Sequence, residues 1–578
     1  MSRPPRLPKD RRLGRVAFLA TAVIAGLWLY VPRAEAGPIH VNCDAGGNLQ
    51  HKIDVAPGGS TILVQGTCDG SFSIDGKGLT LKGDPTATID GQHAGSTLTF
   101  DAGGKTLHLT DLRVTGGVAP GQGGGVNVLH GSLTLLRTTV TGNRAVADDY
   151  SYGGGIAILG VDAGDLSITA SRITNNRALT EPSSGFAYAQ GGGIVAMGTV
   201  TISHSTISAN VARATSADSY AYAYGGAIQS GPITVAGSTI ANNVARASAP
   251  TTYAYAYGGA LQVGPLDLTG STISGNHVIA HSGTSYAYTY GGAMDIGSGT
   301  ISGSTVKQNT TDSHGELYAY SYGGGIFSEG GALSLEHSSV LFNGVSARSN
   351  GSYAYVYGGG ISSGGDVVHL QRSTVGGNDA SVISDVDNAF GYGGGVSAEA
   401  LQAINSTVAS NTLSASSQTG AAKTGAAYGG GVFVDDGATL TNVTVASNTA
   451  AASGDTFTSE GGGLYATDLT TKASILAQNH GTTGIDCNAT TTSKGFNLVQ
   501  HPGKCLTTPK PSDVTGQGAQ LGSLQNNGGP TLTMAIAATS PAFNAIPGAL
   551  CAVPFDQRGV PRPQGPRCDI GAFERKVP

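Results

Sequence analysis

The sequence predicts an all-β fold: a right-handed parallel β-helix, or β-solenoid, with three short strands per turn and a cap at each end. Three observations lead to this prediction. The chain has a repeat of about 33 residues, a glycine run and an asparagine keep step within each copy, and strand-like segments lie between them. Self-similarity at a period of ~20–50 residues is typical of solenoids, in which each turn covers the open face of the turn before it.

The glycine runs and the asparagines mark eleven copies. The runs are spaced 30 to 38 residues apart and begin at Gly123, Gly153, Gly191, Gly225, Gly258, Gly291, Gly323, Gly358, Gly393, Gly429 and Gly461. Each copy has an aliphatic residue followed three positions later by Asn143, Asn176, Asn210, Asn243, Asn276, Asn309, Asn343, Asn378, Asn411, Asn448 or Asn479. Like residues on successive turns lie ~4.8 Å apart, so each Asn amide can reach the next carbonyl. We expect a structural Asn ladder, with glycine at tight corners.

The segments between these markers have the pattern of strands. ITVAGSTI (233–240) and LDLTGSTI (266–273) alternate apolar with small or polar residues and are rich in Thr, Val and Ile. Such alternation, bounded by Gly or Asn, favours short half-buried strands. Alternating runs upstream of the first glycine run fit the opening turns of the same helix.

The N-terminus has the features of a secretory signal. Six basic residues precede an apolar run from Val16 to Val31, and Ala34 to Ala36 form an A-x-A cleavage site. An uncleaved anchor is the alternative, but this run is shorter than the ~20 residues that a spanning helix needs. We expect a signal peptide at 1–36, an N-terminal cap with the first turns at 37–119, the repeat helix at 120–480 and a disulfide-containing cap at 481–578. The product is expected to be monomeric, secreted or at the cell surface, with no transmembrane span after cleavage.

The net charge and the cysteine spacings indicate which partners, metals and cofactors to expect. Without residues 1–36 the chain has 24 basic and 35 acidic side chains, and an acidic chain without a basic patch argues against nucleic acid. No cysteine spacing is C-x-x-C, so we expect neither a metal site nor a cofactor. Six cysteines allow ~15 connectivities. Near-neighbour pairing is the simplest, giving Cys43–Cys68, Cys487–Cys505 and Cys551–Cys568.

Twenty of the 22 tyrosines lie just before the glycine runs, at alternate positions. A spacing of two places the rings on one face of a strand and the intervening alanines on the other. Over adjacent turns this predicts a tyrosine strip three columns wide: Tyr220, Tyr222, Tyr224, Tyr253, Tyr255, Tyr257, Tyr286, Tyr288, Tyr290, Tyr318, Tyr320, Tyr322, Tyr353, Tyr355 and Tyr357. The rings either stack on one another to rigidify an arm on each turn, or also bind glycans or another surface.

A catalytic site in the repeats would need carboxylates clustered across neighbouring turns. The fourth position after the first glycine gives Gln229, Gln262 and Asp295 on consecutive turns. This column has only one carboxylate. The three residues are therefore catalytic candidates that lack the second carboxylate of a catalytic pair. The sixth position gives Glu329, Glu399 and Asp435, with Gly364 on an intervening turn.

The paired GGA(I/L/M) and x-x-N markers over about residues 120–480 resemble the repeats of the polymorphic outer-membrane protein family, which implies a surface-exposed β-helix associated with adhesion. Residues 521–574, which end in the block DQRGVPRPQGPRCDIGAFE (556–574), resemble the choice-of-anchor Q domain, which implies a secreted bacterial protein. We expect residues 521–574 to cover the last strand edge. Their charged residues Asp556, Arg558, Asp569 and Glu574 are expected to form ion pairs and turn bonds.

These observations favour a β-helical binding, adhesion or structural protein that uses its tyrosine strip to contact glycans or other cell-surface material. The alternative is a polysaccharide lyase or glycoside hydrolase of the β-helix class. A third interpretation is a rigid spacer.

Overall fold

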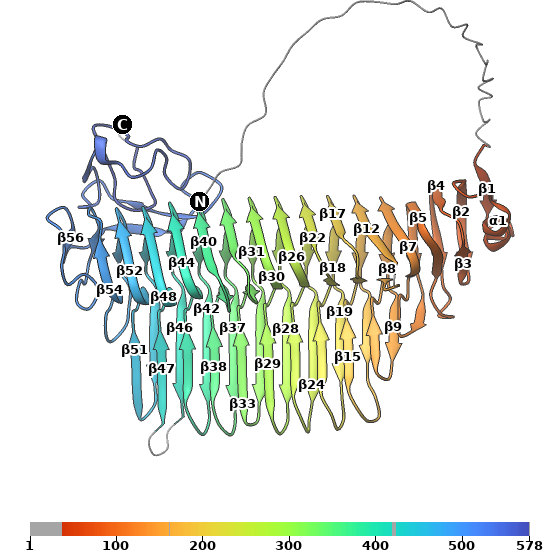
Figure 1. Ribbon diagram of the computed structural model, residues 1–578, viewed down its shortest axis with the longest axis horizontal. Helices are drawn as coiled ribbons and strands as arrows, with labels where there is room; N and C mark the ends of the chain where they lie inside the picture. Colours follow the sequence, from red (N-terminus) through yellow and green to blue (C-terminus); the bar gives the residue numbers. More distant parts are fainter. Residues whose placement is uncertain (1–36, 161, 419–422, 577–578) are drawn as a thin grey trace, which may run out of the picture. The chain divides into compact units, whose positions relative to one another are not determined.

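Each repeat folds into one turn of a parallel β-solenoid, as the turn that starts at Gly225 illustrates. Three strands form its main part, which we call the body: β21 (Ile228–Ser230), β22 (Ile233–Ala236) and β23 (Thr239–Ala241). The chain then leaves the body in β24 (Val244–Ala249) and returns in β25 (Ala254–Tyr257) to the next glycine pair. The body of the turn therefore has three strands, as predicted, and an arm of two further strands projects from it (Figure 1).

The computed structural model describes residues 37–160, 162–418 and 423–576, and Pro38–Pro578 forms one compact unit. The predicted signal peptide lies outside the described residues. The all-β prediction is confirmed, with about 11 turns of parallel stacked strands. Within the described ranges, no helix is both long and apolar enough to cross a membrane.

The body strands stack in register on one another. Ile240 lies opposite Ile207 on one neighbouring turn and Ile273 on the other. Ile240 and its counterparts point inward into a continuous core of Ile, Val and Leu. The remaining body strands are β2 (Thr61–Asp69), β3 (Phe72–Asp75), β4 (Leu79–Asp90), β5 (Leu98–Thr115), β7 (Val126–Leu136), β8 (Thr139–Thr141), β11 (Ile156–Ile158), β12 (Ala163–Thr169), β13 (Arg172–Thr174), β16 (Ile194–Ala196), β17 (Val200–Ser203), β18 (Thr206–Ser208), β26 (Leu261–Thr269), β27 (Thr272–Ser274), β30 (Met294–Ser302), β31 (Thr305–Lys307), β34 (Ile326–Ser328), β35 (Leu333–Glu336), β36 (Ser339–Leu341), β39 (Ile361–Ser363), β40 (Val367–Gln371), β41 (Thr374–Gly376), β44 (Val396–Ile404), β45 (Thr407–Ala409), β48 (Val432–Thr441), β49 (Thr444–Ala446), β52 (Leu464–Lys472) and β53 (Ile475–Ala477).

The arms stack into a flat layer, which we call the fin, made of two parallel sheets in the described chain (Figure 1). The outgoing sheet has eleven strands: β6 (Val118–Pro120), β9 (Arg144–Ala147), β14 (Arg177–Thr180), β19 (Val211–Thr215), β24, β28 (His277–Ser282), β32 (Thr310–Gly315), β37 (Gly344–Ser349), β42 (Asp379–Ser384), β46 (Thr412–Ser417) and β50 (Thr449–Ser453). The returning sheet has ten: β10 (Tyr150–Tyr152), β15 (Ala187–Gln190), β20 (Ala221–Tyr224), β25, β29 (Tyr286–Tyr290), β33 (Tyr318–Tyr322), β38 (Ala354–Tyr357), β43 (Ala389–Tyr392), β47 (Thr424–Tyr428) and β51 (Thr456–Glu460).

Small side chains, most of them alanine, fill the space between the two sheets of the fin. Ala245 and Ala247 of β24 are buried in one cluster with Ala254 and Ala256 of β25. Because side chains alternate along a strand, these inward alanines require Tyr255 and Tyr257 to face outward. The small core makes the fin thin and aligns its outer residues turn after turn.

The glycine pair between the fin and the next turn is required by close backbone contacts. Gly225 has φ +55°, and a Cβ there would lie 2.1 Å from the carbonyl oxygen of Ile228. A Cβ on Gly226 would lie 2.2 Å from the oxygen of Gly259 on the next turn. Only glycine fits such a corner without shifting the backbone.

The N-terminal end of the solenoid carries a short helix that the repeat pattern does not predict. Strand β1 (Ile39–Asn42) pairs with β2, and helix α1 (Leu49–Val55) buries Leu49 and Ile53 against β2 and β3. The Cys43–Cys68 disulfide joins the segment between β1 and α1 to β2. These elements cover strand backbone that would otherwise form an exposed edge.

Beyond the last full turn, β54 (Cys487–Ser493), β55 (Leu498–Val499) and β56 (Val514–Thr515) continue the body, with the Cys487–Cys505 disulfide beside them. The chain then forms two antiparallel pairs, β57 (Leu521–Gln525) with β58 (Thr533–Ile536) and β59 (Ile546–Pro547) with β60 (Arg567–Cys568). A 3-10 turn, η1 (Gly548–Leu550), precedes Cys551, which is bonded to Cys568. All three disulfide pairs are those predicted.

The segment 521–574 lies along the flank of the solenoid, which differs from the predicted position over the last strand edge. Thr374 donates to the oxygen of Leu532 at 2.6 Å, and Thr407 to Gln557 at 2.6 Å. These threonines belong to β41 and β45, whose residues are all buried, whereas β23 exposes Thr239. The segment lies there because those late turns present small and apolar residues on this face, which Met534 covers.

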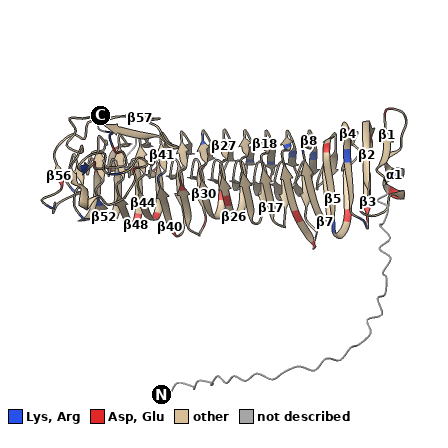
Figure 2. Ribbon diagram, turned by 90° about the horizontal axis from the view of Figure 1, so that it is seen from above, with Lys and Arg blue, Asp and Glu red and all other residues tan. Residues whose placement is uncertain are grey.

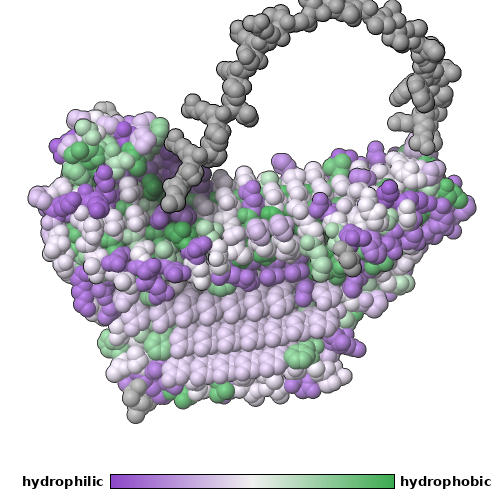
Figure 3. Space-filling model, in the orientation of Figure 1, coloured by the Kyte–Doolittle hydropathy of each residue, from purple (hydrophilic) through white to green (hydrophobic). Residues whose placement is uncertain are grey.

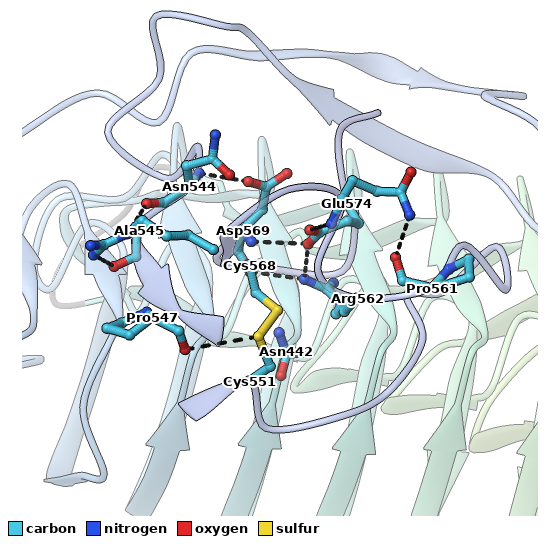
Figure 4. Close-up of a disulfide and its surroundings, with 12 residues drawn as sticks. Asn442, Asn544, Ala545, Pro547, Cys551, Pro561, Arg562, Cys568, Asp569 and Glu574 are labelled. Atoms are coloured by element: carbon cyan, nitrogen blue, oxygen red, sulfur yellow. Dashed lines mark hydrogen bonds and ion pairs between the residues drawn. A yellow bond between two sulfur atoms is a disulfide. The ribbon is translucent and has the colours of Figure 1, made fainter. Parts of the chain in front are cut away.

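The charged residues of this segment hold it together. Asp556 accepts hydrogen bonds from Arg558 at 2.7 Å, and Arg562 forms a fully buried ion pair with Glu574 at 2.8 Å. Arg558 also lies over the ring of Phe573, 3.6 Å from its centroid. Figure 4 shows the Arg562–Glu574 pair beside the Cys551–Cys568 disulfide. These charged side chains are engaged in contacts within the segment, as predicted from the sequence.

Candidate binding surface

The outer face of the returning sheet carries the tyrosines in register. Tyr222, Tyr255 and Tyr288 are opposite one another on consecutive turns. The tyrosines on either side of them also stack from turn to turn. All fifteen tyrosines predicted for the strip are half-buried and lie in three columns, either within β20, β25, β29, β33 and β38 or directly before these strands. We call this surface the tyrosine face, and its rows of rings are visible on the lower part of Figure 3.

The rings stack along each column with their faces together. In the middle column, neighbouring centroids are 4.8 to 5.0 Å apart and the planes differ by 2 to 4°. Rings of one strand, such as Tyr255 and Tyr257, are also nearly parallel, at 6.4 Å. Because neighbours cover both faces of an interior ring, the groups that reach solvent are ring edges and hydroxyls.

The hydroxyls are free to interact with a ligand. Throughout the described chain, those of the fifteen tyrosines make no hydrogen bond to protein. Burial raises the pKa of Tyr222 and of Tyr320 to about 12, and neighbouring tyrosines add to the effect. A phenol is both a donor and an acceptor while it is protonated. The tyrosine face is therefore an uncharged array of hydroxyls with fixed positions.

The Asn ladder is buried against the glycine runs. Asn243 Nδ2 donates to Asn276 Oδ1 at 2.9 Å, and Asn243 Oδ1 accepts from the backbone and side-chain nitrogens of Asn210. The same pattern joins all eleven asparagines, which are buried. At the end Asn479 donates to Asp486, which takes the place of a twelfth asparagine. The ladder is enclosed and cannot reach a ligand.

A second ladder, of serines, was missed at the sequence level. The backbone nitrogen of Ser205 donates to Ser238 Oγ at 3.0 Å, and that of Ser238 to Ser271 Oγ at the same distance. It extends from Ser171 to Ser406. The repeated serine before the last body strand, the first letter of "ST", was the available signal.

The three catalytic candidates stack as predicted, but Asp295 is closed off from solvent. Gln229, Gln262 and Asp295 are in register at the corner between body and fin, followed by Phe327. Asp295 is 1 % exposed and neither carboxylate oxygen has a hydrogen-bond partner. Burial, and then the charge of Glu329, raise the pKa of Asp295 well above its usual value. A carboxyl in this position does not contact a solvent-borne polymer.

The charged groups of the described residues were compared with the requirements of a metal site. Across the described ranges, no three His, Cys, Asp or Glu side chains are grouped to hold a metal ion. On the face seen in Figure 2, basic and acidic residues are sparse and interspersed. We therefore take the tyrosine face as the candidate binding surface.

Comparison with known proteins gave no relative: no family model, no curated protein and no solved structure matches this chain. Neither of the two family resemblances is supported by these comparisons.

Proposed function

We propose that this protein is a secreted or cell-surface binding protein whose tyrosine face adheres to an extended glycan. The observation that carries the proposal is the registered array of fifteen tyrosines with unpaired hydroxyls on five consecutive turns. A ligand with repeating, neutral, hydroxyl-rich units matches a repeating, neutral, hydroxyl-rich surface.

Preorganisation makes such a surface effective. Stacking already fixes the rings, so little side-chain entropy remains to be lost on binding. Each hydroxyl can donate to one sugar hydroxyl and accept from another. One such contact is weak, but many along one polymer add up through multivalency.

The mode of contact differs from stacking of sugars on aromatic faces. Interior rings have no free face, since Tyr255 lies between Tyr222 and Tyr288. We therefore assign binding to the hydroxyls and ring edges, with a polymer lying flat on the tyrosine face and running along the columns. A polymer that follows the columns would meet a hydroxyl on every turn.

A screen against immobilised and insoluble glycans tests the proposal. The parent protein is expected to bind at least one glycan, and Tyr222→Ala combined with Tyr255→Ala is expected to weaken binding at least about tenfold. The control is Ser381→Ala with Ser414→Ala, which removes two hydroxyls from the opposite face of the fin. Absence of any glycan ligand for the parent would contradict the proposal and leave a rigid spacer as the better interpretation.

A further inference from the structure

A cleft of about 780 Å³ lies at the inner corner where the first turns of the fin meet the body. On the fin side it is lined by Gln122, Tyr152 and Gln190, and on the body side by Met197 and Gln229. We call it the corner cleft. Its volume is within the ~300–1,000 Å³ of ordinary small-ligand sites.

The cleft occurs where the tyrosine column nearest the glycine runs, which contains Tyr224 and Tyr257, is interrupted. Tyr152 pairs with Gln122 on one side and Gln190 on the other, and Gln190 pairs with Tyr224, where the continuous column begins. Among the described residues, the one ring-to-ring contact of Tyr152 is with Tyr150 of its own strand, whose centroid is 6.1 Å away. Tyr152 therefore lacks the stacked neighbours that cover the rings of the tyrosine face.

The polar groups of the cleft are neutral and available. In the described structure the side-chain amides of Gln122, Gln190 and Gln229 make no hydrogen bond to protein, and all three are half-buried. None of the lining side chains is Asp, Glu, Lys, Arg or His. A glutamine amide offers two donors and an acceptor, which suits adjacent hydroxyls on one sugar ring.

We propose that the corner cleft binds a short stretch of neutral oligosaccharide, with the ring of Tyr152 as a stacking platform and the three glutamine amides as hydrogen-bonding partners. The exposed side chain of Met197 supplies apolar contact at the rim. This inference takes its ligand class from the proposed function, but it assigns a separate site that a soluble ligand can fill.

A peptide is the less suitable occupant. Among the strands that border the cleft, β15, β16 and β21 are each paired on both sides. The fourth, β10, is the edge strand of the returning sheet, but its backbone at Tyr152 is already bonded to Gly121 and Gly123, so it cannot pair there with an extended peptide. Side-chain amides and one aromatic ring match a sugar without requiring such an edge.

The test is calorimetric titration of the full chain with soluble neutral tetrasaccharides of glucose, mannose and N-acetylglucosamine. The parent is expected to bind at least one of them. Gln190→Tyr, which would complete the column and fill the cleft, is expected to weaken that binding at least about tenfold. Gln229→Ala removes one amide from the other wall and is expected to weaken it about threefold or more. Gln402→Ala, an exposed body residue remote from the lining, is the matched control.

The outcomes separate this inference from the proposed function. If the parent binds an insoluble glycan but no tetrasaccharide, or if Gln190→Tyr and Gln229→Ala both keep full tetrasaccharide affinity, the corner cleft is not a sugar site and the tyrosine face is unaffected. Tetrasaccharide binding without polymer binding would retain the cleft and overturn the proposed function. Binding of a neutral tetraglycine peptide in preference to the sugars would overturn the ligand class.

Discussion

Tyr255 and Tyr288 lie one turn apart with ring centroids 4.8 Å apart and an angle of 4° between their planes. This relationship recurs through three columns and gives the same rings two roles. The faces stabilise the fin, and the hydroxyls form its outer surface. Substitutions that separate the ring from the hydroxyl therefore separate stability from binding.

The ring of Tyr255 is expected to contribute to stability and its hydroxyl is not. Tyr255→Ala removes stacking on two neighbouring turns, at ~0.5–1.5 kcal/mol for each ring pair, so it should cost about 1–3 kcal/mol. Tyr255→Phe keeps the ring and should change stability by less than about 0.5 kcal/mol. Urea unfolding of both variants measures this, and equal losses for Phe and Ala would contradict the stacking account.

Stability is expected to fall at alkaline pH because of the same rings. An unfolded tyrosine has a pKa of ~10, whereas burial raises that of Tyr222 and Tyr320 to about 12. Between these values the unfolded chain releases protons that the folded chain keeps, so the free energy of unfolding decreases as pH rises. Below pH ~10 these tyrosines should have no effect. Urea midpoints measured alongside phenolate absorbance test this, and an unchanged midpoint up to pH 12 would contradict it.

Asn243→Ala is expected to destabilise the body. It would leave the backbone and side-chain donors of Asn210 without their acceptor at 2.9 and 3.0 Å. A buried donor without a partner costs ~1–3 kcal/mol, so the loss should be at least about 2 kcal/mol. Thr239→Ala, at an exposed position of the same turn, should have a smaller effect. Similar melting temperatures for the two variants would show that the ladder adds little.

Asp295→Asn is expected to stabilise the protein at neutral pH. Burial raises the pKa of Asp295, so stability is lost as pH rises above the unfolded value of ~4 toward the folded value. The substitution removes this loss, and its gain in melting temperature should be larger at pH 7 than at pH 4. Exposed Asp267→Asn is the control. A variant less stable than the parent at pH 7 would contradict this account.

Much of the fold follows from the repeat itself. The spacing of Asn243 and Asn276 fixes one turn per repeat, and alternation at Tyr253, Tyr255 and Tyr257 fixes which face the rings occupy. The two-sheet fin was harder to predict, because the alanines that form its core also occur in loops and exposed strands. A period gives the length of a turn but not whether part of that turn leaves the body.

The other unpredicted features depend on contacts between distant parts of the chain. Gln557 bonds to Thr407, 150 residues away, and no local pattern indicates that pairing. The corner cleft likewise depends on Gln190 replacing a tyrosine beside Gln229 of the next turn. A single exception within a column is visible in sequence only when the register of every turn is known.

The most direct test of the central claim is the dissociation constant for a glycan ligand of the parent and of a variant with Tyr222→Phe, Tyr255→Phe, Tyr288→Phe and Tyr320→Phe. This variant keeps four stacked rings of the middle column and removes their hydroxyls. Our account predicts that affinity falls at least about tenfold while the melting temperature is unchanged, since each lost hydrogen bond contributes ~0.5–1.5 kcal/mol. Unchanged affinity would show that the tyrosine hydroxyls do not bind the glycan.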